Sequence, residues 1–214
     1  MDDSVPRRTV IVGAGGHAKV VVDVLRADAS VELVGCLGQG RDLAVLGLPV
    51  IGGDDELSRL LEQGVHHAFI AIGNNARRMQ LAKKAEAIGF ELVNAVSPHA
   101  YVSPSASLGR GVAIMAGAIV QPAATIGSYS IINTGATVDH DTTIGEAAHI
   151  APGCALSGSV FVGERSFLGT GAKVIDGMRI GSDCMIGAGA VIIRHIPDRA
   201  LAVGVPAIIK RIQA

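Results

Sequence analysis

The sequence predicts an α/β N-terminal domain with a small, mainly parallel sheet, followed by a left-handed parallel β-helix of hexapeptide repeats. Three observations support this fold class. A β-branched run at residues 9–12 ends in a glycine-rich turn that opens a helical pattern. Strand-like and helix-like patterns then alternate as far as residue 93. From residue 102 to residue 192, an aliphatic side chain returns at every sixth position without an insertion, which is typical of a solenoid of short strands.

The 214 residues are enough for two modest domains, which we expect at 1–98 and 99–214. Hydrophobic residues make up 49% of the chain and aromatic residues 3%, so small aliphatic side chains must build both cores. The net charge of −1 offers no basic surface for nucleic acid, and no apolar run could span a membrane. The short polar start shows no signal peptide. Cys154 and Cys184 occupy the inward small-residue register of the repeat and are expected to be buried fillers and not disulfides, so we expect a reducing, cytoplasmic setting.

The first strand, residues 9–12, runs into Gly13-Ala14-Gly15-Gly16-His17, which leads into a helix. Glycines allow close backbone approach, and the N–H groups that open a helix form a site for phosphate. The turn also matches a dinucleotide fingerprint, which requires an acid at the end of the second strand. The predicted second strand, residues 32–34, runs into Gly35-Cys36-Leu37 instead, and this disfavours an NAD site.

The same alternation continues through the rest of the first domain. We expect a short strand and turn at 49–53, a helix through 57–61, a strand at 68–72, a helix at about 76–88 and a strand at 90–93. Asp54 or Asp55 could cap the helix at 57–61. Ligands of such sheets lie beyond the carboxyl ends of the strands, where the turn after residue 12 and the loop at Gly73 both fall.

The second domain is expected to form triangular coils of three hexads each. Large aliphatic residues point inward, and the position four residues on is mostly small, so it fills a corner. Sixteen hexads give a little over five coils, stacked about 4.8 Å apart. Residues 202–207 break the repeat, and we expect residues 208–212 to cap the open end as a short helix. The aliphatic register is Val102, Leu108, Ile114, Val120, Ile126, Ile132, Val138, Ile144, Ile150, Leu156, Val162, Leu168, Val174, Ile180, Ile186 and Ile192.

Charged and imidazole side chains are scarce in the coil, which makes Asp139-His140-Asp141 conspicuous. His140 lies two positions after an inward aliphatic residue and should project outward. An outward histidine beside a carboxylate is a candidate general base. Gly158 follows eighteen residues later, which is one coil, so it should stack beside His140 and could direct its N–H at a developing oxyanion.

The other histidines of the coil favour no metal. His149 falls half a coil from His140, on another part of the prism unless a neighbouring subunit brings it close. His140, His149 and His195 share no common phase, so a three-histidine zinc site is disfavoured. No Ser-His-Asp arrangement follows from the spacing either, and this favours direct attack by the substrate over an acyl-enzyme.

Five segments together resemble the nucleotide-sugar acetyltransferases of the sialic acid O-acetyltransferase type, a left-handed β-helix family. They are residues 10–19, 72–75, 138–141, 149–153 and 204–207, and they are distributed over nearly the whole chain. The resemblance implies an acetyl-CoA-dependent N-acetyltransferase acting on the 4-amino group of a nucleotide-linked 4-amino-4,6-dideoxysugar, with GDP-perosamine favoured. It further implies a homotrimer that holds acetyl-CoA in a cleft between subunits, while the N-terminal domain holds the nucleotide sugar.

The resemblance also implies roles for individual residues. His140 would be the base, Asp141 would raise its basicity, and the Gly158 N–H would bind the thioester oxygen as it becomes tetrahedral. Acetyl-CoA would contact His149, Thr170 and Ala188. The sugar nucleotide would contact Gly13, Gly15, Gly16, His17 and Gly73.

One departure from the family concerns the nucleobase. UDP-sugar members commonly end the second strand in an acidic pair that reads uracil, whereas this chain has Cys36-Leu37-Gly38 there. That difference favours another base and agrees with a guanosine-linked substrate. The rival interpretations are an O-acetyltransferase acting on a sialic acid or related hydroxyl acceptor, a UDP-linked amino sugar N-acetyltransferase, and a non-catalytic nucleotide-sugar-binding scaffold.

Overall fold

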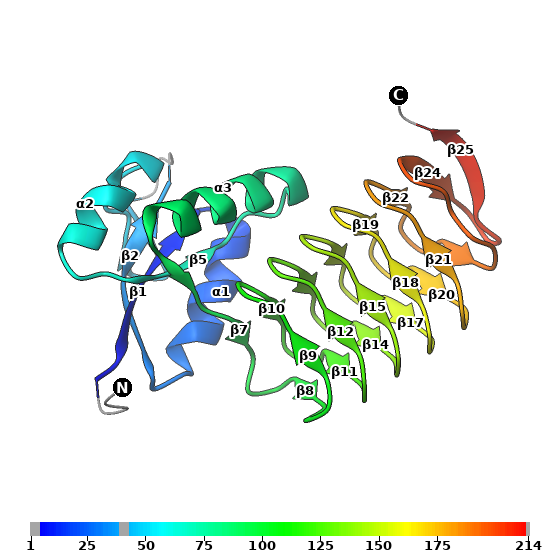
Figure 1. Cartoon of the computed structure of the whole chain (residues 1–214), viewed down its shortest axis with the longest axis horizontal. Helices are drawn as coiled ribbons and strands as arrows, with labels where there is room; N and C mark the ends of the chain where they lie inside the picture. Colours follow the sequence, from blue (N-terminus) through cyan, green and yellow to red (C-terminus); the bar gives the residue numbers. More distant parts are fainter. Residues whose placement is uncertain (1–4, 39–42, 213–214) are drawn as a thin grey trace. The chain divides into compact units, whose positions relative to one another are not determined.

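The computed structural model describes residues 5–38 and 43–212, and the chain divides into two compact units, Met1–Ser97 and Pro98–Ala214 (Figure 1). Each unit contains its own core. Among the described residues, none of the helices combines the length and the apolar character that a membrane span needs.

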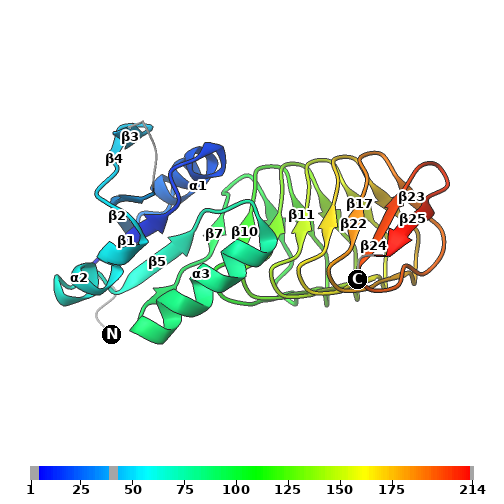
Figure 2. The ribbon, with the colours of Figure 1, turned by 90° about the horizontal axis from the view of Figure 1, so that it is seen from above.

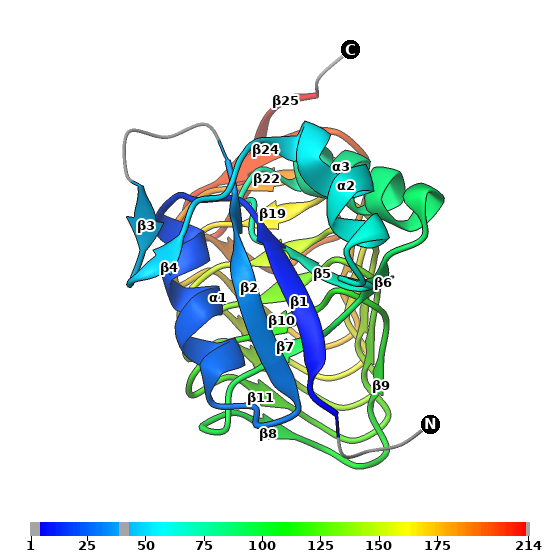
Figure 3. The same cartoon turned by 90° about the vertical axis from the view of Figure 1, so that its left-hand side faces the viewer.

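The first unit is built on a four-stranded parallel sheet in the order β2-β1-β5-β6. Its strands are β1 (Arg7–Val12), β2 (Val31–Leu37), β5 (His67–Ile70) and β6 (Glu91–Leu92). The central strand β1 lies beside β2 (Figure 3) and buries Val10, Ile11 and Val12 completely. A buried, β-branched central strand of this kind is what the run at residues 9–12 predicted.

Helices and short strands complete the first unit. They are α1 (Gly16–Arg26), β3 (Ala44–Val45), β4 (Leu48–Pro49), the 3₁₀ turn η1 (Asp54–Glu56), α2 (Leu57–Glu62), α3 (Asn75–Ile88) and β7 (Ala95–Val96). Asn74 caps α3 by accepting the Arg77 N–H at 2.9 Å, and Gly89 ends α3 in the left-handed region. The alternation of strand and helix is therefore confirmed.

Two details of the first unit differ from the prediction. β2 continues through Gly35 and Cys36 to Leu37, because a register shift between Thr9 and Val10 keeps β2 paired with β1. The predicted cap at Asp54 or Asp55 is wrong. The turn η1 precedes α2, and neither element has a side-chain cap.

The second unit is a parallel β-helix of sixteen two-residue strands, each ending on one predicted aliphatic residue. Their bounds are β8 (Tyr101–Val102), β9 (Ser107–Leu108), β10 (Ala113–Ile114), β11 (Ile119–Val120), β12 (Thr125–Ile126), β13 (Ile131–Ile132), β14 (Thr137–Val138), β15 (Thr143–Ile144), β16 (His149–Ile150), β17 (Ala155–Leu156), β18 (Phe161–Val162), β19 (Phe167–Leu168), β20 (Lys173–Val174), β21 (Arg179–Ile180), β22 (Met185–Ile186) and β23 (Val191–Ile192). Figure 2 shows successive coils stacked along the prism.

Every third strand belongs to the same face of the prism. One face is a six-stranded sheet from β8 to β23, and another is a five-stranded sheet from β9 to β21. The third face includes β10, β13, β16, β19 and β22. Partners lie eighteen residues apart, as in Val120 beside Val138, so one coil is three hexads. Cys154 and Cys184 are buried in the core of small residues between these faces.

The end of the solenoid is closed by strands and not by the predicted helix. β24 (Ala200–Val203) pairs in parallel with β22, and β25 (Ile208–Ile212) pairs antiparallel with β24. Isoleucines occupy three of the five positions of β25. Such β-branched residues favour a strand, and the edge of β24 offers the backbone partners that the strand requires.

Candidate active site

The corner that follows β14 carries the His140 cluster. Asp141 adopts the left-handed region with φ 58°, which turns the chain out of the strand. The Asp141 N–H donates to Pro122 O one coil earlier, and His140 O accepts from Ser159 N–H one coil later at 2.9 Å. These backbone bonds stack the corners of successive coils, and the structure thereby brings His140 and Gly158 together.

Gly158 leaves space for the imidazole of His140. A Cβ atom built on Gly158 would lie 2.5 Å from His140 Cε1 and 2.7 Å from Nε2, so no larger residue fits without moving the ring. The N–H of Gly158 has no acceptor among the described residues. The corner therefore presents a backbone donor directly beside an imidazole nitrogen.

Asp141 orients and polarises this imidazole. Its Oδ2 atom lies 2.8 Å from His140 Nδ1, and this hydrogen bond raises the pKa of His140 above 6.5, with smaller contributions from the charges of Asp139, Asp141 and Asp176. An Nδ1–H that donates to Asp141 leaves the lone pair on Nε2, the atom that faces Gly158. The His140 side chain is 56% exposed, so a substrate can reach it.

Asp176 is a third group at this corner that the sequence analysis did not select. It lies one coil beyond Gly158, whose carbonyl accepts from the Gly177 N–H at 3.0 Å. Its Oδ1 atom would be 3.1 Å from a Cβ atom on Gly158. The signal that could have found it is the same step of eighteen residues that links His140 to Gly158.

The three residues expected to contact acetyl-CoA share another part of the prism. His149 belongs to β16 on the third face, while Thr170 and Ala188 lie at the corner after that face, one coil apart. The Thr170 carbonyl accepts from the Gly189 N–H at 2.8 Å. Within the described chain, the structure does not bring this group to the His140 corner.

His149 is held in a defined orientation. Asn133 Oδ1 accepts the Thr134 N–H, which leaves the Asn133 amide Nδ2 to donate to His149 Nε2 at 3.0 Å. The ring also lies edge-on against Phe167, with centroids 5.1 Å apart. Asn133 thus fixes the orientation of the His149 ring, and sequence reasoning missed it because no short motif connects the two residues.

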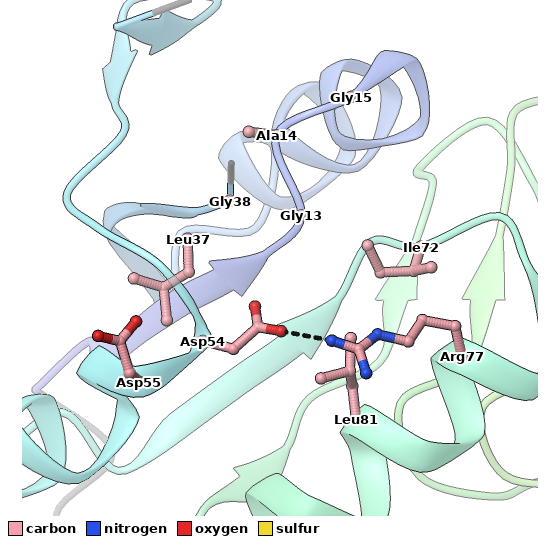
Figure 4. A pocket seen from close by; sticks show the side chains of 10 residues that line it. All are labelled: Gly13, Ala14, Gly15, Leu37, Gly38, Asp54, Asp55, Ile72, Arg77 and Leu81. Atoms are coloured by element: carbon pink, nitrogen blue, oxygen red, sulfur yellow. Dashed lines mark hydrogen bonds and ion pairs between the residues drawn. The ribbon is translucent and has the colours of Figure 1, made fainter. Parts of the chain in front are cut away.

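The first unit contains a pocket of about 590 Å³ at the carboxyl ends of the strands (Figure 4). Such a volume is ordinary for a small-molecule site. Gly13 and Gly15 line the pocket, whereas Gly16, His17 and Gly73 are not among its lining residues. The complete lining is Gly13, Ala14, Gly15, Leu37, Gly38, Asp54, Asp55, Ile72, Arg77 and Leu81.

The glycine turn shapes one wall of this pocket. Gly13 has φ +125°, and a Cβ atom there would lie 2.6 Å from Ala71 O, so only glycine allows the turn to pass this close to the end of β5. Gly15 precedes α1 and provides no side-chain cap. A Cβ on Gly15 or Gly16 would meet nothing within 4 Å, so space is open above the N–H groups that begin α1.

Arg78 fixes the loop at Gly73 from inside the fold. Its buried guanidinium donates to Ile72 O at 2.9 Å, to Gly73 O at 3.1 Å and to Asn75 Oδ1 at 2.8 Å. Burial lowers the pKa of Arg78 to about 10, so the side chain stays charged at neutral pH. Sequence reasoning missed Arg78 because a basic residue in a helix is usually solvated.

His17 is a neutral group beside this arginine. Burial, and then the charge of Arg78, lower the pKa of His17 to about 4. Its Nε2 atom is buried without a hydrogen-bond partner among the described residues. At neutral pH the imidazole therefore offers one donor and one acceptor and no positive charge.

Comparison with known proteins agrees with this combination of units. The family model described as PglD N-terminal domain matches residues 8–85. UDP-N-acetylbacillosamine N-acetyltransferase of Bacillus subtilis (strain 168) is 41% identical over 114 residues, which are 51% of this chain. That match spans 52% of the relative's own length.

Solved structures match over nearly the whole chain. PerB from Caulobacter crescentus, in complex with CoA and GDP-perosamine, is 52% identical with a TM-score of 0.91, covering 95% of this chain and 97% of that one. A variant of this perosamine N-acetyltransferase, with the same ligands, has a TM-score of 0.93. The acetyltransferase domain of PglB from Neisseria gonorrhoeae, in complex with acetyl coenzyme A, is 40% identical with a TM-score of 0.91 and covers 95% and 99% of the two chains.

A β-helix with an exposed His–Asp pair, joined to an α/β unit with a nucleotide-sized pocket, defines the class of hexapeptide-repeat acyltransferases. Within that class, the chain belongs to the family of acetyl-CoA-dependent nucleotide-sugar N-acetyltransferases.

Proposed function

We propose that the protein transfers an acetyl group from acetyl-CoA to the 4-amino group of a GDP-linked 4-amino-4,6-dideoxysugar, with GDP-perosamine as the acceptor. Two observations support this substrate. The relative that is 52% identical over nearly the whole chain was crystallised with GDP-perosamine. The end of β2 has no acidic pair of the kind that uracil recognition uses in UDP-sugar members of the family.

The proposed reaction is a direct transfer. The neutral amine of the sugar attacks the thioester carbonyl, a C–N bond forms, and His140 Nε2 accepts the proton from the amine. The carbonyl oxygen becomes an oxyanion that accepts from the Gly158 N–H. The C–S bond then breaks, and the departing thiolate takes the proton from His140. Asp141 stabilises the imidazolium between these two steps.

The two units divide the substrates between them in this proposal. Gly13, Gly15, Gly16, the neutral His17 and the loop at Gly73 bind the nucleotide sugar. His149, Thr170 and Ala188 bind acetyl-CoA. Because this last group and His140 lie on different parts of one prism, we propose a homotrimer whose clefts combine them. A cytoplasmic setting fits the three free, buried cysteines.

The single observation that carries the proposal is that His140 Nε2 lies directly beside Gly158, whose backbone N–H has no acceptor among the described residues. The test is His140→Asn, assayed for CoA release with GDP-perosamine. We expect kcat to fall by about 10²- to 10⁴-fold, while the affinities for both substrates and the unfolding temperature stay near those of the unmodified protein.

The raised pKa of His140 predicts how activity changes with pH. Because His140 must be unprotonated to act and its pKa is raised, activity should rise with pH through an ionisation above 6.5. Asp141→Asn removes the main cause of the raised pKa, so the same ionisation should move to lower pH while kcat falls. An unchanged pH profile in His140→Asn would contradict the assignment of the base.

The rival interpretations give different results in the same assay. An O-acetyltransferase would release CoA with hydroxyl acceptors such as sialic acid and not with amino sugars. A UDP-linked enzyme would prefer the uridine substrate. A scaffold without catalysis would bind the nucleotide sugar and release no CoA.

A further inference from the structure

The pocket of the first unit contains an ion pair that phosphate binding and acetyl transfer do not use. Arg77 Nη2 in α3 donates to Asp54 Oδ2 in η1 at 2.9 Å, and both residues line the pocket. Figure 4 shows the other carboxylate oxygen of Asp54 pointing away from Arg77, toward the turn at Gly13. An acceptor and a donor group thus lie side by side in the pocket.

The two carboxylates at this wall, Asp54 and Asp55, place the pair at the nucleobase end of a bound nucleotide. Phosphate oxygens are expected at the opening of α1 near Gly15, where the first N–H groups of the helix have no intrahelical acceptor. Asp54 and the neighbouring Asp55 would repel a diphosphate, so the part of the ligand beside them must be the uncharged base or ribose.

The order of acceptor and donor matches guanine. The edge of guanine presents two adjacent donors, N1–H and the 2-amino group, followed by the acceptor O6. A carboxylate accepts from both donors, and a guanidinium donates to O6. Among the described residues, Arg77 gives one N–H to Asp54 and one to Gln80, so other N–H groups of its five remain for a ligand.

Uracil does not match the same pair. Its edge presents O4, N3–H and O2, so a carboxylate that accepts from N3–H would have its second oxygen against O2. Two acceptors in contact repel one another and leave both without a hydrogen bond. The pair therefore selects guanine in two ways. It satisfies the hydrogen-bonding groups of guanine, and it places an acceptor against an acceptor of uracil.

We propose that Asp54 and Arg77 form the nucleobase reader of this protein and select guanine over uracil. The inference rests on the proposed binding of a nucleotide sugar in this pocket and adds the residues that determine its specificity. It also accounts for the absence of an acid at the end of β2, because η1 supplies the carboxylate instead.

The test compares the binding of GDP, IDP and UDP to the full-length protein by titration calorimetry. IDP lacks only the 2-amino group of guanine, so the unmodified protein should bind IDP about 10- to 100-fold more weakly than GDP. Asp54→Asn should bring the GDP and IDP affinities close together, because the amide cannot accept from both donors. Arg77→Gln should weaken GDP and IDP equally, since both bases carry O6.

Glu56→Gln is the matched control, because Glu56 lies on the same turn, pairs with Arg59 and does not line the pocket. Its GDP to IDP ratio should equal that of the unmodified protein, and unfolding temperatures should show that every variant folds. Equal weakening of GDP, IDP and UDP by Asp54→Asn would overturn the inference without contradicting the proposed function. Loss of the ratio in Asp55→Asn instead would also overturn it. Failure of the unmodified protein to bind any nucleotide would refute the proposed function itself.

Discussion

At the scale of single residues, the proposed chemistry depends on one glycine and one histidine that the solenoid places in contact. Gly158 is buried and has no positive φ, so alanine can adopt its backbone conformation. The added methyl group would instead lie 2.5 Å from His140 Cε1, and the exposed ring would have to turn away. Gly158→Ala therefore tests the geometry of the site separately from the fold.

We expect Gly158→Ala to lower kcat by about 100-fold, because a displacement of this size removes the base from its productive position. The unfolding temperature should change little. Ser157→Ala is the control, since Ser157 is exposed at the preceding position and should leave kcat unchanged. A fully active Gly158→Ala protein would show that the imidazole does not act from its observed position.

The residues of the two candidate sites differ in how far the sequence could reveal them. A strict period of six relates His140 to Gly158 and would equally have revealed Asp176. The Asp54–Arg77 pair could not be predicted, because its partners come from a turn and a helix that meet only through the folding of the first unit. The local sequence pattern predicted that Asp54 caps a helix, whereas in the structure Asp54 pairs with Arg77 and caps no helix.

At the scale of elements, α3 connects the core of the first unit to the loop at Gly73. Arg78 reaches from α3 and donates hydrogen bonds to the carbonyls of Ile72 and Gly73. These hydrogen bonds hold the loop at the end of β5. In Arg78→Met these carbonyls lose their donor, and hydrogen bonds to a charged group are worth about 1.5–3 kcal/mol each. We expect faster amide exchange in residues 72–75 and weaker nucleotide binding, with acetyl-CoA binding unchanged.

Amide hydrogen exchange with mass spectrometry and calorimetry with GDP and acetyl-CoA would measure these effects. Lys84→Met is the matched control, because Lys84 is exposed on the same helix. If Arg78→Met kept the exchange pattern and the GDP affinity, the loop would be fixed by its own backbone and not by the arginine.

Elements also differ in how strongly the sequence determined them. Each of the sixteen hexads formed the strand that its aliphatic residue predicted, since every coil repeats the same packing and reinforces the pattern. The terminal segment departed from the predicted helix because its structure depends on a neighbour, the free edge of β24. The sequence pattern thus predicts secondary structure less well beyond the last repeat than within the repeats.

At the scale of the whole molecule, the described chain separates two groups that the proposed reaction needs. His140 and Gly158 lie at the corner after the face of β14 and β17, whereas His149 belongs to β16 on another face. Cyclic symmetry would let the corner of one subunit face the acetyl-CoA residues of the next. Each site of the proposed trimer would then draw on two chains.

Subunit complementation tests this arrangement. His140→Asn and His149→Ala proteins should each be inactive alone, because every cleft lacks one histidine. Co-expression of the two chains with different tags would give mixed trimers in which some clefts hold both native histidines. In every trimer that carries both tags, one of the three clefts holds both native histidines, so the purified mixed trimers should recover about a third of the unmodified activity. Recovery close to zero, in mixed trimers verified by both tags, would place the whole site within one chain.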